Sequence, residues 1–402
     1  MILSKWRIII VAIIAMKLLL IILVTPWVWG DLFNWTRGAS VALRFISTGR
    51  FPPLSVTGVY GPIEILLVPF FLAWTKLPIP HPPLYRSFLT NYSISAISLS
   101  LLMKLPPFLA DIATGGLLSR LVKQMTNSES KARIALLSWY VNPFNLYYIE
   151  VFGAMDTIPA AIIVLGLILG LESKWFRSGI SASIGTVLRI YPLFILPFLF
   201  TTIKTKLLRR YAALLAGFLL PLAAALIIMY AYGAGTITML ATLPQQEYWL
   251  LDFLGVTLLQ NVKLTPVILV IQLFVTIYFW RKNSILHAAT VSLLALSVGA
   301  LPFGGSEQNF IWVSPLLSAC LAVNLDELWV FVFTFATACL YPSIIPYQGL
   351  TYITPLLAGA FYGAKATYLT KINFENIRET VPVKKKLNAP TIGNELPDQI
   401  KT

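Results

Sequence analysis

The sequence predicts an all-α polytopic membrane protein, and three observations carry this prediction. Of the 402 residues, 57% are hydrophobic and only 11% are charged, whereas a soluble domain averages about 25% charged residues. The mean hydropathy is +0.78. Many apolar runs approach the roughly 20 residues that a helix needs to cross a bilayer. Backbone polar groups inside a bilayer must be bonded within the protein, so these runs are expected to cross as helices.

The first apolar run, from about residue 8 to residue 29, is predicted to be a retained first span and signal anchor. It is too long for the core of a signal peptide, and it lacks a clear cleavage site with small residues. Lys5 and Arg7 precede it. Because basic residues favour the cytoplasmic side, the N-terminus is expected inside and Asp31 outside.

A large first external loop, 31–90, is predicted to contain juxtamembrane helices. Its apolar run 63–74 is short for a span and is surrounded by prolines. Such a run is expected to lie in the membrane interface. The alternative is a true second span, which would change the number of crossings.

The later apolar runs complete a predicted bundle of about 11–13 transmembrane helices within a membrane domain, 1–370. A second external loop is expected at 233–261, and the polar tail 371–402 is expected to be disordered and cytoplasmic. The further single spans are predicted at 94–122, 134–148, 157–171, 211–232, 264–280, 286–301, 310–323, 328–345 and 351–369.

The stretch 179–200 is predicted to be two short helices rather than one span. Basic residues flank both of its ends, so both ends are expected in the cytoplasm. Arg189 to Pro192 interrupt its apolar sequence. The two helices would then meet at an outer apex near Arg189, and broken helices are tolerated only where they line a cavity.

The net charge of +14 comes from 30 basic and 16 acidic residues. It is interpreted as the positive-inside rule together with attraction to anionic lipids. No basic module with groove-reading elements is visible, so nucleic acid is not an expected partner. The two cysteines, Cys320 and Cys339, lie in predicted spans, and they cannot form a disulfide framework or a metal cluster.

Ionisable residues gather at the predicted outer ends of spans, and this asymmetry predicts a polar cavity that opens outward. An ionisable group in a membrane is costly and is a functional candidate by default. The residues are Asp31, Glu64, Lys104, Asp111, Glu150, Asp156, Arg189, Glu247, Asp252 and Glu307.

Asp31 is predicted to be a general base that takes the proton from an acceptor hydroxyl; the alternative is a helix-end charge without a special task. A single carboxylate suits inverting chemistry, whereas retaining chemistry would need a second one, for which Asp156 is available. Arg189 is predicted to bind the leaving phosphate bidentately, or else to snorkel towards the interface. Lys104 is a second candidate phosphate ligand, or else it simply reaches the interface, and Asp111 would pair with it.

Two further groups of side chains are candidates for sugar contacts. The turn Gly304–Asn309 offers donors and acceptors suited to sugar hydroxyls, and Gln308 lies in it; a plain tight turn explains the sequence almost as well. Trp27, Trp29 and Trp35 are interpreted as interfacial belt aromatics rather than sugar-stacking residues.

In their order along the chain, these motifs resemble class C glycosyltransferases, most closely the catalytic subunit of GPI mannosyltransferase I and its prokaryotic relatives. The resemblance covers roughly residues 5–325 and rests on Asp31 and on these segments: Phe45–Arg50, Tyr60–Pro62, Lys104–Leu105, Asp111–Gly115, Trp139, Asn142–Pro143, Gly153–Asp156, Arg189–Pro192 and Ser306–Trp312.

The resemblance implies a GT-C-like bundle that takes a mannose-like hexose from a dolichyl- or polyprenyl-phosphate donor. The acceptor would be a lipid-linked or glycan molecule on the external or luminal face. The membrane would be a prokaryotic plasma membrane, or the endoplasmic reticulum in a eukaryote. Asp31 matches the family's external acid. The residues implied to bind sugar or acceptor are Tyr60, Asn142, Asp156, Glu307 and Gln308.

Two departures from the family pattern matter. The family usually shows an Asp-x-Asp pair, whereas here Asp31 is followed by Asn34, so no metal is assigned and the cofactor stays unknown. The basic residue before the Tyr-Pro pair is commonly lysine and here is Arg189, which keeps the positive charge.

A polytopic transporter or flippase is the alternative function, and a non-catalytic subunit is a third. The resemblance also allows for a small membrane partner subunit.

Overall fold

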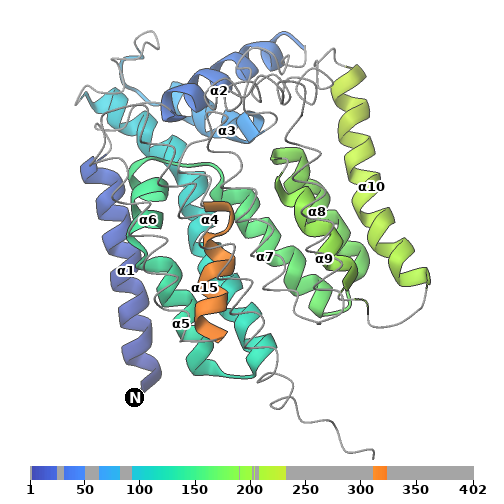
Figure 1. Cartoon of the computed structure of the whole chain (residues 1–402). Helices are drawn as coiled ribbons and strands as arrows, with labels where there is room; N and C mark the ends of the chain where they lie inside the picture. The colour runs from blue at the N-terminus through green and yellow to red at the C-terminus, as the bar shows by residue number, and fades with distance from the viewer. Residues whose placement is uncertain are drawn as a thin grey trace, which may run out of the picture.

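The computed structural model describes residues 2–24, 31–49, 63–81, 93–189, 191–201, 203, 208–231 and 311–323. The regular elements in these ranges are all helices, and no strand occurs among them. Three of the helices are long and apolar enough to cross a membrane: α1 (Ile2–Val24), α4 (Ile94–Thr126) and α10 (Leu208–Ala231) (Figure 1). The all-α prediction is therefore confirmed for the described residues. The predicted total of about 11–13 spans, the loop 233–261 and the tail 371–402 depend on residues outside these ranges.

Helix α1 presents most of its surface outward. Among its described side chains, only Lys17 and Ile21 are buried, and the large apolar side chains around them, such as Ile8 and Leu23, are exposed. An apolar surface of this kind suits lipid. The helix contacts the bundle through α4 and the π-helix η4 (Leu146–Val151).

Helices α2 (Asp31–Ser47) and α3 (Ile63–Thr75) lie together at the end of the bundle opposite the N-terminus (Figure 1). The 13 residues of α3 span about 20 Å, less than the roughly 30 Å of a hydrocarbon core. This length favours the interfacial interpretation over a second span. The two helices pack on α4 through one apolar cluster: Leu32, Trp35, Ala39, Leu67, Phe71, Trp74, Leu99 and Met103.

The predicted span 134–148 is not one continuous helix, because the helix there ends early. Helix α5 (Glu129–Tyr140) is followed by the single turn α6 (Pro143–Asn145) and then by η4. The cause is the Asn-Pro step: the residue before a proline is pushed out of the helical region. Asn142 accordingly has φ −62° and ψ 117°.

Helices α4 and α5 meet in a tight turn at the same end of the bundle as the N-terminus (Figure 1). Helix α4 ends at Asn127, which adopts the left-handed conformation with φ 53°, and Ser128 caps α5. Lys123 pairs with Glu129 across this turn. Basic residues at this end agree with the expected cytoplasmic side.

Helices α7 (Thr157–Leu171) and α8 (Trp175–Leu188) form the next pair, and Glu172 ties their turn to α4. Its carboxylate accepts hydrogen bonds from Lys174, Gln124 and Arg120. These donors favour the ionised form and lower the pKa of Glu172 to about 2, with the bond from Lys174 contributing most.

The predicted helix break near Arg189 is confirmed. Helix α8 ends at Leu188, Arg189 is extended with φ −153° and ψ 141°, and a 3-10 turn, η5 (Tyr191–Ile195), leads into α9 (Leu196–Thr201). The returning chain packs back on α8: a Cβ built on Gly185 would lie 3.0 Å from Cβ of Pro192.

Helix α15 (Ser314–Val323) is fully buried over its first nine residues and packs against α4, α5 and α7. The expected span at 310–323 therefore contains a helix that begins at Ser314, after a turn. Its last carbonyl, on Val323, accepts a hydrogen bond of 2.8 Å from the Lys131 ammonium. A lysine in this place satisfies a helix end that has no partner within the helix.

Two glycines allow α8 and α10 to approach each other closely. A Cβ on Gly179 would collide with the carbonyl oxygen of Leu214, and a Cβ on Gly217 would collide with that of Phe176. Small residues at such contacts are typical of helices that pack inside membranes.

Replacing Gly217 by alanine should therefore lower the stability of the folded protein by about 1–3 kcal/mol, since an overpacked contact against backbone cannot relax cheaply. The measurement is the midpoint of thermal unfolding in detergent. Gly116→Ala is the matched control, because a Cβ there meets nothing within 4 Å and alanine favours a helix. Equal midpoints for the two variants would contradict this packing.

Candidate functional site

Arg189 occupies the break between α8 and η5 and is held by a carboxylate. Its Nε lies 2.9 Å from Oδ1 of Asp156, and its Nη2 donates to Oδ2 at 3.2 Å. The two side chains are 14% and 2% exposed, respectively. The Nη2 contact is a hydrogen bond and the Nε contact is a close ion-pair contact, and together they orient the guanidinium.

Asp156 is itself fixed from two sides. It lies at the start of α7, where the positive end of the helix dipole favours a carboxylate. The hydroxyl of Tyr191 donates to its backbone carbonyl at 2.8 Å. The ring of Tyr191 stacks on Trp312, with centroids 4.5 Å apart and an interplanar angle of 12°. Residues from three motifs that the sequence singled out therefore meet here: Asp156, Arg189 with Tyr191, and Trp312.

Trp35 connects this group to the helix that Asp31 begins. The Arg189 guanidinium lies 5.4 Å from the centroid of the Trp35 ring, within range of a cation–π contact. Trp35 is completely buried, so its interpretation as a belt aromatic is wrong. Asp31 is the first residue of α2. Positions 31 and 35 share one face of that helix, where Cβ atoms four residues apart are about 6 Å from each other.

Lys104 is deeply buried and uses its ammonium on backbone carbonyls. The side chain is completely shielded, and Nζ donates to the carbonyl of Val151 at 2.6 Å and to that of Glu150 at 3.2 Å. These are the last carbonyls of η4, which have no partner within their own helix. The predicted role of Lys104 as a phosphate ligand stays a prediction.

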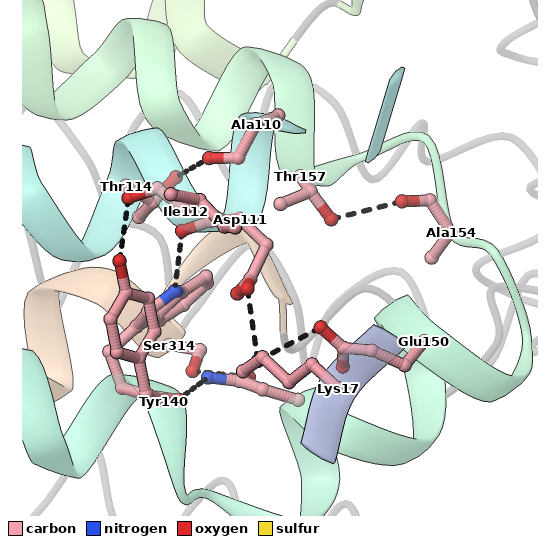
Figure 2. A network of polar contacts seen from close by, with 12 residues as sticks. Lys17, Ala110, Asp111, Ile112, Thr114, Tyr140, Glu150, Ala154, Thr157 and Ser314 are labelled. Carbon is pink, nitrogen blue, oxygen red and sulfur yellow. Dashed lines mark hydrogen bonds and ion pairs between the residues drawn. The ribbon is translucent and has the colours of Figure 1, made fainter. Parts of the chain in front are cut away.

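Asp111 pairs with Lys17 and not, as expected, with Lys104. The Lys17 ammonium lies 2.9 Å from Oδ2 of Asp111 and 2.9 Å from Oε1 of Glu150, and all three side chains are completely shielded. Figure 2 shows this ammonium between the two carboxylates. The ring of Tyr140 lies 5.4 Å from the same ammonium. The network joins α1, α4, α5 and η4.

Lys17 was missed by the sequence reasoning, although a signal existed. It is the one charged residue between Arg7 and Asp31, in the middle of the first apolar run. A lysine at such a depth is expected to face the bundle and to find an acidic partner. The high hydropathy of the whole run favours a plain anchor, and a single lysine lowers that hydropathy little.

The remaining predicted sugar- or acceptor-binding residues fall into two groups. Asn142 is buried, and its Oδ1 accepts from the Phe144 backbone N–H at 3.0 Å, so it caps α6. Its neighbour Asn145 accepts from Ser314 at 2.8 Å. Tyr60, Glu307 and Gln308 lie outside the described residues.

Within the described parts of the chain, no group of three or more His, Cys, Asp and Glu residues could hold a metal ion. The chain matches no protein-family model, no curated protein and no solved structure.

Proposed function

We propose that the protein is a glycosyltransferase that moves a mannose-like hexose from a dolichyl- or polyprenyl-phosphate donor to a lipid-linked or glycan acceptor. Transfer would occur at the external or luminal face, with inversion at the anomeric carbon. The observation that supports this best is the contact between Arg189 and Trp35. This contact joins the helix break, which carries the Arg189 guanidinium, to helix α2, which begins at Asp31. A guanidinium is a group suited to binding phosphate.

The proposed reaction is a single displacement. Asp31 takes the proton of the acceptor hydroxyl while the hydroxyl oxygen forms a bond to the anomeric carbon. The bond from this carbon to the phosphate oxygen breaks, and the lipid phosphate leaves with the electron pair. Arg189 stabilises the charge that develops on the phosphate. Asp156 would orient the Arg189 guanidinium, and the anomeric configuration inverts because only one displacement occurs.

Several assignments remain predictions within this proposal. Tyr60, Asn142, Glu307 and Gln308 are proposed to contact the sugar or the acceptor, as the family resemblance implies. Asp156 was predicted in the same group, and its carboxylate is engaged by Arg189 in this structure. A sugar hydroxyl could reach Asp156 only beside that ion pair.

Replacing Asp31 by asparagine should reduce sugar transfer by roughly 10²- to 10⁴-fold, which is the usual contribution of a positioned general base. The assay follows transfer from polyprenyl-phosphate mannose, or its glucose analogue, to candidate acceptors by the purified protein. Asp31→Glu should keep part of the activity, since it retains a carboxylate. Glu129→Gln is the matched control, because it likewise replaces a carboxylate by an amide, in an exposed side chain at the start of α5. The proposal fails if lipid-linked sugar is never consumed, or if Asp31→Asn transfers sugar at the unmodified rate.

A transporter or flippase is the second candidate, and the Lys17 network is the observation that favours it. Buried ion pairs inside membrane helices often mark proton or substrate pathways. Such a protein would move a lipid-linked sugar across proteoliposomes without breaking its phosphate bond. Intact donor recovered in the opposite leaflet would favour this candidate, whereas free polyprenyl phosphate would favour transfer.

A further inference from the structure

Two buried lysines hold the same residue, Glu150, from different sides. Lys17 of α1 binds its side-chain carboxylate at 2.9 Å. Lys104 of α4 binds its backbone carbonyl at 3.2 Å and the next carbonyl, of Val151, at 2.6 Å. Glu150 is completely shielded. Burying a lysine costs free energy unless its ammonium has a partner. Solubility and helix propensity do not explain why two lysines occupy buried positions here, so their contacts with Glu150 need another explanation.

The segment that follows Glu150 and Val151 is a tight turn whose backbone is held by hydrogen bonds. Phe152, Gly153 and Ala154 each donate a backbone hydrogen bond back into η4, at 2.8, 3.1 and 2.8 Å. Gly153 has φ +77°, a conformation that favours glycine. A Cβ at this position would lie 3.3 Å from Cγ of Lys104 and 3.8 Å from Leu32 of α2.

The turn ends at the residue that orients Arg189. Ala154 and Met155 are completely buried, and Asp156 is the N-cap residue that precedes α7. A displacement of η4 would therefore be transmitted along a short, hydrogen-bonded stretch to the Asp156 carboxylate. The hydrogen bond and the ion-pair contact between Asp156 and Arg189 depend on the position of that carboxylate to within fractions of an ångström.

We propose that Lys104, together with Lys17, is a positioning residue: the two lysines clamp Glu150 and thereby set the place of Asp156 and the direction of the Arg189 guanidinium. Lys104 then acts through the protein backbone and not by binding the donor phosphate. The effect on catalysis rests on the proposed function, whereas the clamp itself does not.

The clamp is tested without any assay of activity, by hydrogen exchange of the backbone amides in a peptide covering residues 150–157. In Lys104→Met, exchange of the amides of Phe152, Gly153 and Ala154 should become at least about tenfold faster. Loss of a hydrogen bond from a charged donor makes local opening easier, and this raises the exchange rate by about tenfold or more. Lys104→Arg keeps donors for the two carbonyls and should retain slow exchange. Lys123→Met is the matched control, because it makes the same change in an exposed lysine of the same helix.

The outcomes separate the clamp from other roles. Faster exchange in Lys104→Met that Lys104→Arg restores supports the clamp, provided that peptides of α7 and α8 keep their protection. Unchanged exchange at residues 152–154 overturns it. If Lys104→Met exchanges faster everywhere because it has unfolded, Glu150→Gln decides, since it weakens the contact with Lys17 while Lys17 keeps Asp111: faster exchange confined to residues 150–157 supports the clamp, and no local change overturns it.

Steady-state kinetics with polyprenyl-phosphate mannose give the second readout. A positioning role predicts a kcat at least about tenfold lower in Lys104→Met with little change in KM for the donor, because the loss falls on the transition state. A raised donor KM with unchanged kcat and unchanged exchange would make Lys104 a phosphate ligand and overturn the inference. If no variant, nor the unmodified protein, consumes the donor, the proposed function fails while the exchange experiment still decides the clamp.

Discussion

Replacing Lys17 by methionine should destabilise the protein by about 3–5 kcal/mol, the usual cost of removing one partner from a buried ion pair. The change leaves the carboxylates of Asp111 and Glu150 shielded and without their shared cation. Methionine has nearly the same length, so the loss would come from charge and not from a cavity. The measurement is thermal unfolding in detergent, together with hydrogen exchange of α1.

The effect should be partly reversed when the two acids are neutralised as well. The triple variant Lys17→Met, Asp111→Asn, Glu150→Gln removes all three charges, and neutral replacements of buried ion pairs are often tolerated. Lys174→Met is the control, because that lysine is 46% exposed and its pair with Glu172 lies at the surface, where such pairs contribute little. If Lys17→Met unfolds at the same temperature as Lys174→Met, the network does not anchor α1.

The loss of stability in Lys17→Met is expected to be large because Lys17 attaches α1 to the rest of the bundle. The helix buries only Lys17 and Ile21 among its described side chains, and apolar contacts between helices gain little in lipid because the lipid is equally apolar. Polar contacts must then supply much of its attachment. Loss of Lys17 should therefore increase exchange in α1 more than in α7.

Replacing Arg189 by glutamine should reduce transfer of sugar from polyprenyl-phosphate mannose by roughly 10²- to 10³-fold. This is the size of effect seen when one preorganised donor is removed from a developing negative charge. Glutamine can still donate a hydrogen bond, but it lacks the positive charge and the planar fork. The measurement is kcat with saturating donor and acceptor.

Arg177→Gln is the matched control, since it makes the same change in an exposed residue of α8 far from the helix break. The single variant Arg189→Gln also leaves the Asp156 carboxylate without its ion-pair partner, and that loss alone could unfold the site. The double variant Arg189→Gln, Asp156→Asn removes this complication and should fold while remaining inactive. Transfer at the unmodified rate by the double variant would show that Arg189 does not stabilise the leaving phosphate.

The helix break at Arg189 illustrates how much could be predicted from the sequence. Basic residues flank the stretch 179–200 at both ends, and a chain that begins and ends on one side of a membrane must turn within it. A polar residue followed by a proline marks where the turn occurs. The extent of α4, α7 and α10 was predictable in the same way, because hydropathy and charge are properties of local sequence.

Pairing among the buried charges was not predictable in this way. Asp111 was expected to meet Lys104, which lies close to it along the same helix, yet it meets Lys17, which is 94 positions away (111 − 17). Both partners are common residues in unremarkable apolar surroundings. Which lysine reaches which acid depends on how α1, α4 and η4 pack, and that arrangement is the result of many contacts outside the motif.

The sequence by itself determined that this chain belongs in a membrane as helices, that α8 is followed by a break, and that its functional candidates are Asp31 and Arg189. These conclusions follow from hydropathy, charge placement and proline, each of which acts over one or two helical turns. Only the tertiary structure decided that Asp156 and Trp35 hold Arg189 and that Lys17 binds two acids. Such contacts join helices distant in sequence, and their geometry is set by packing rather than by any local pattern.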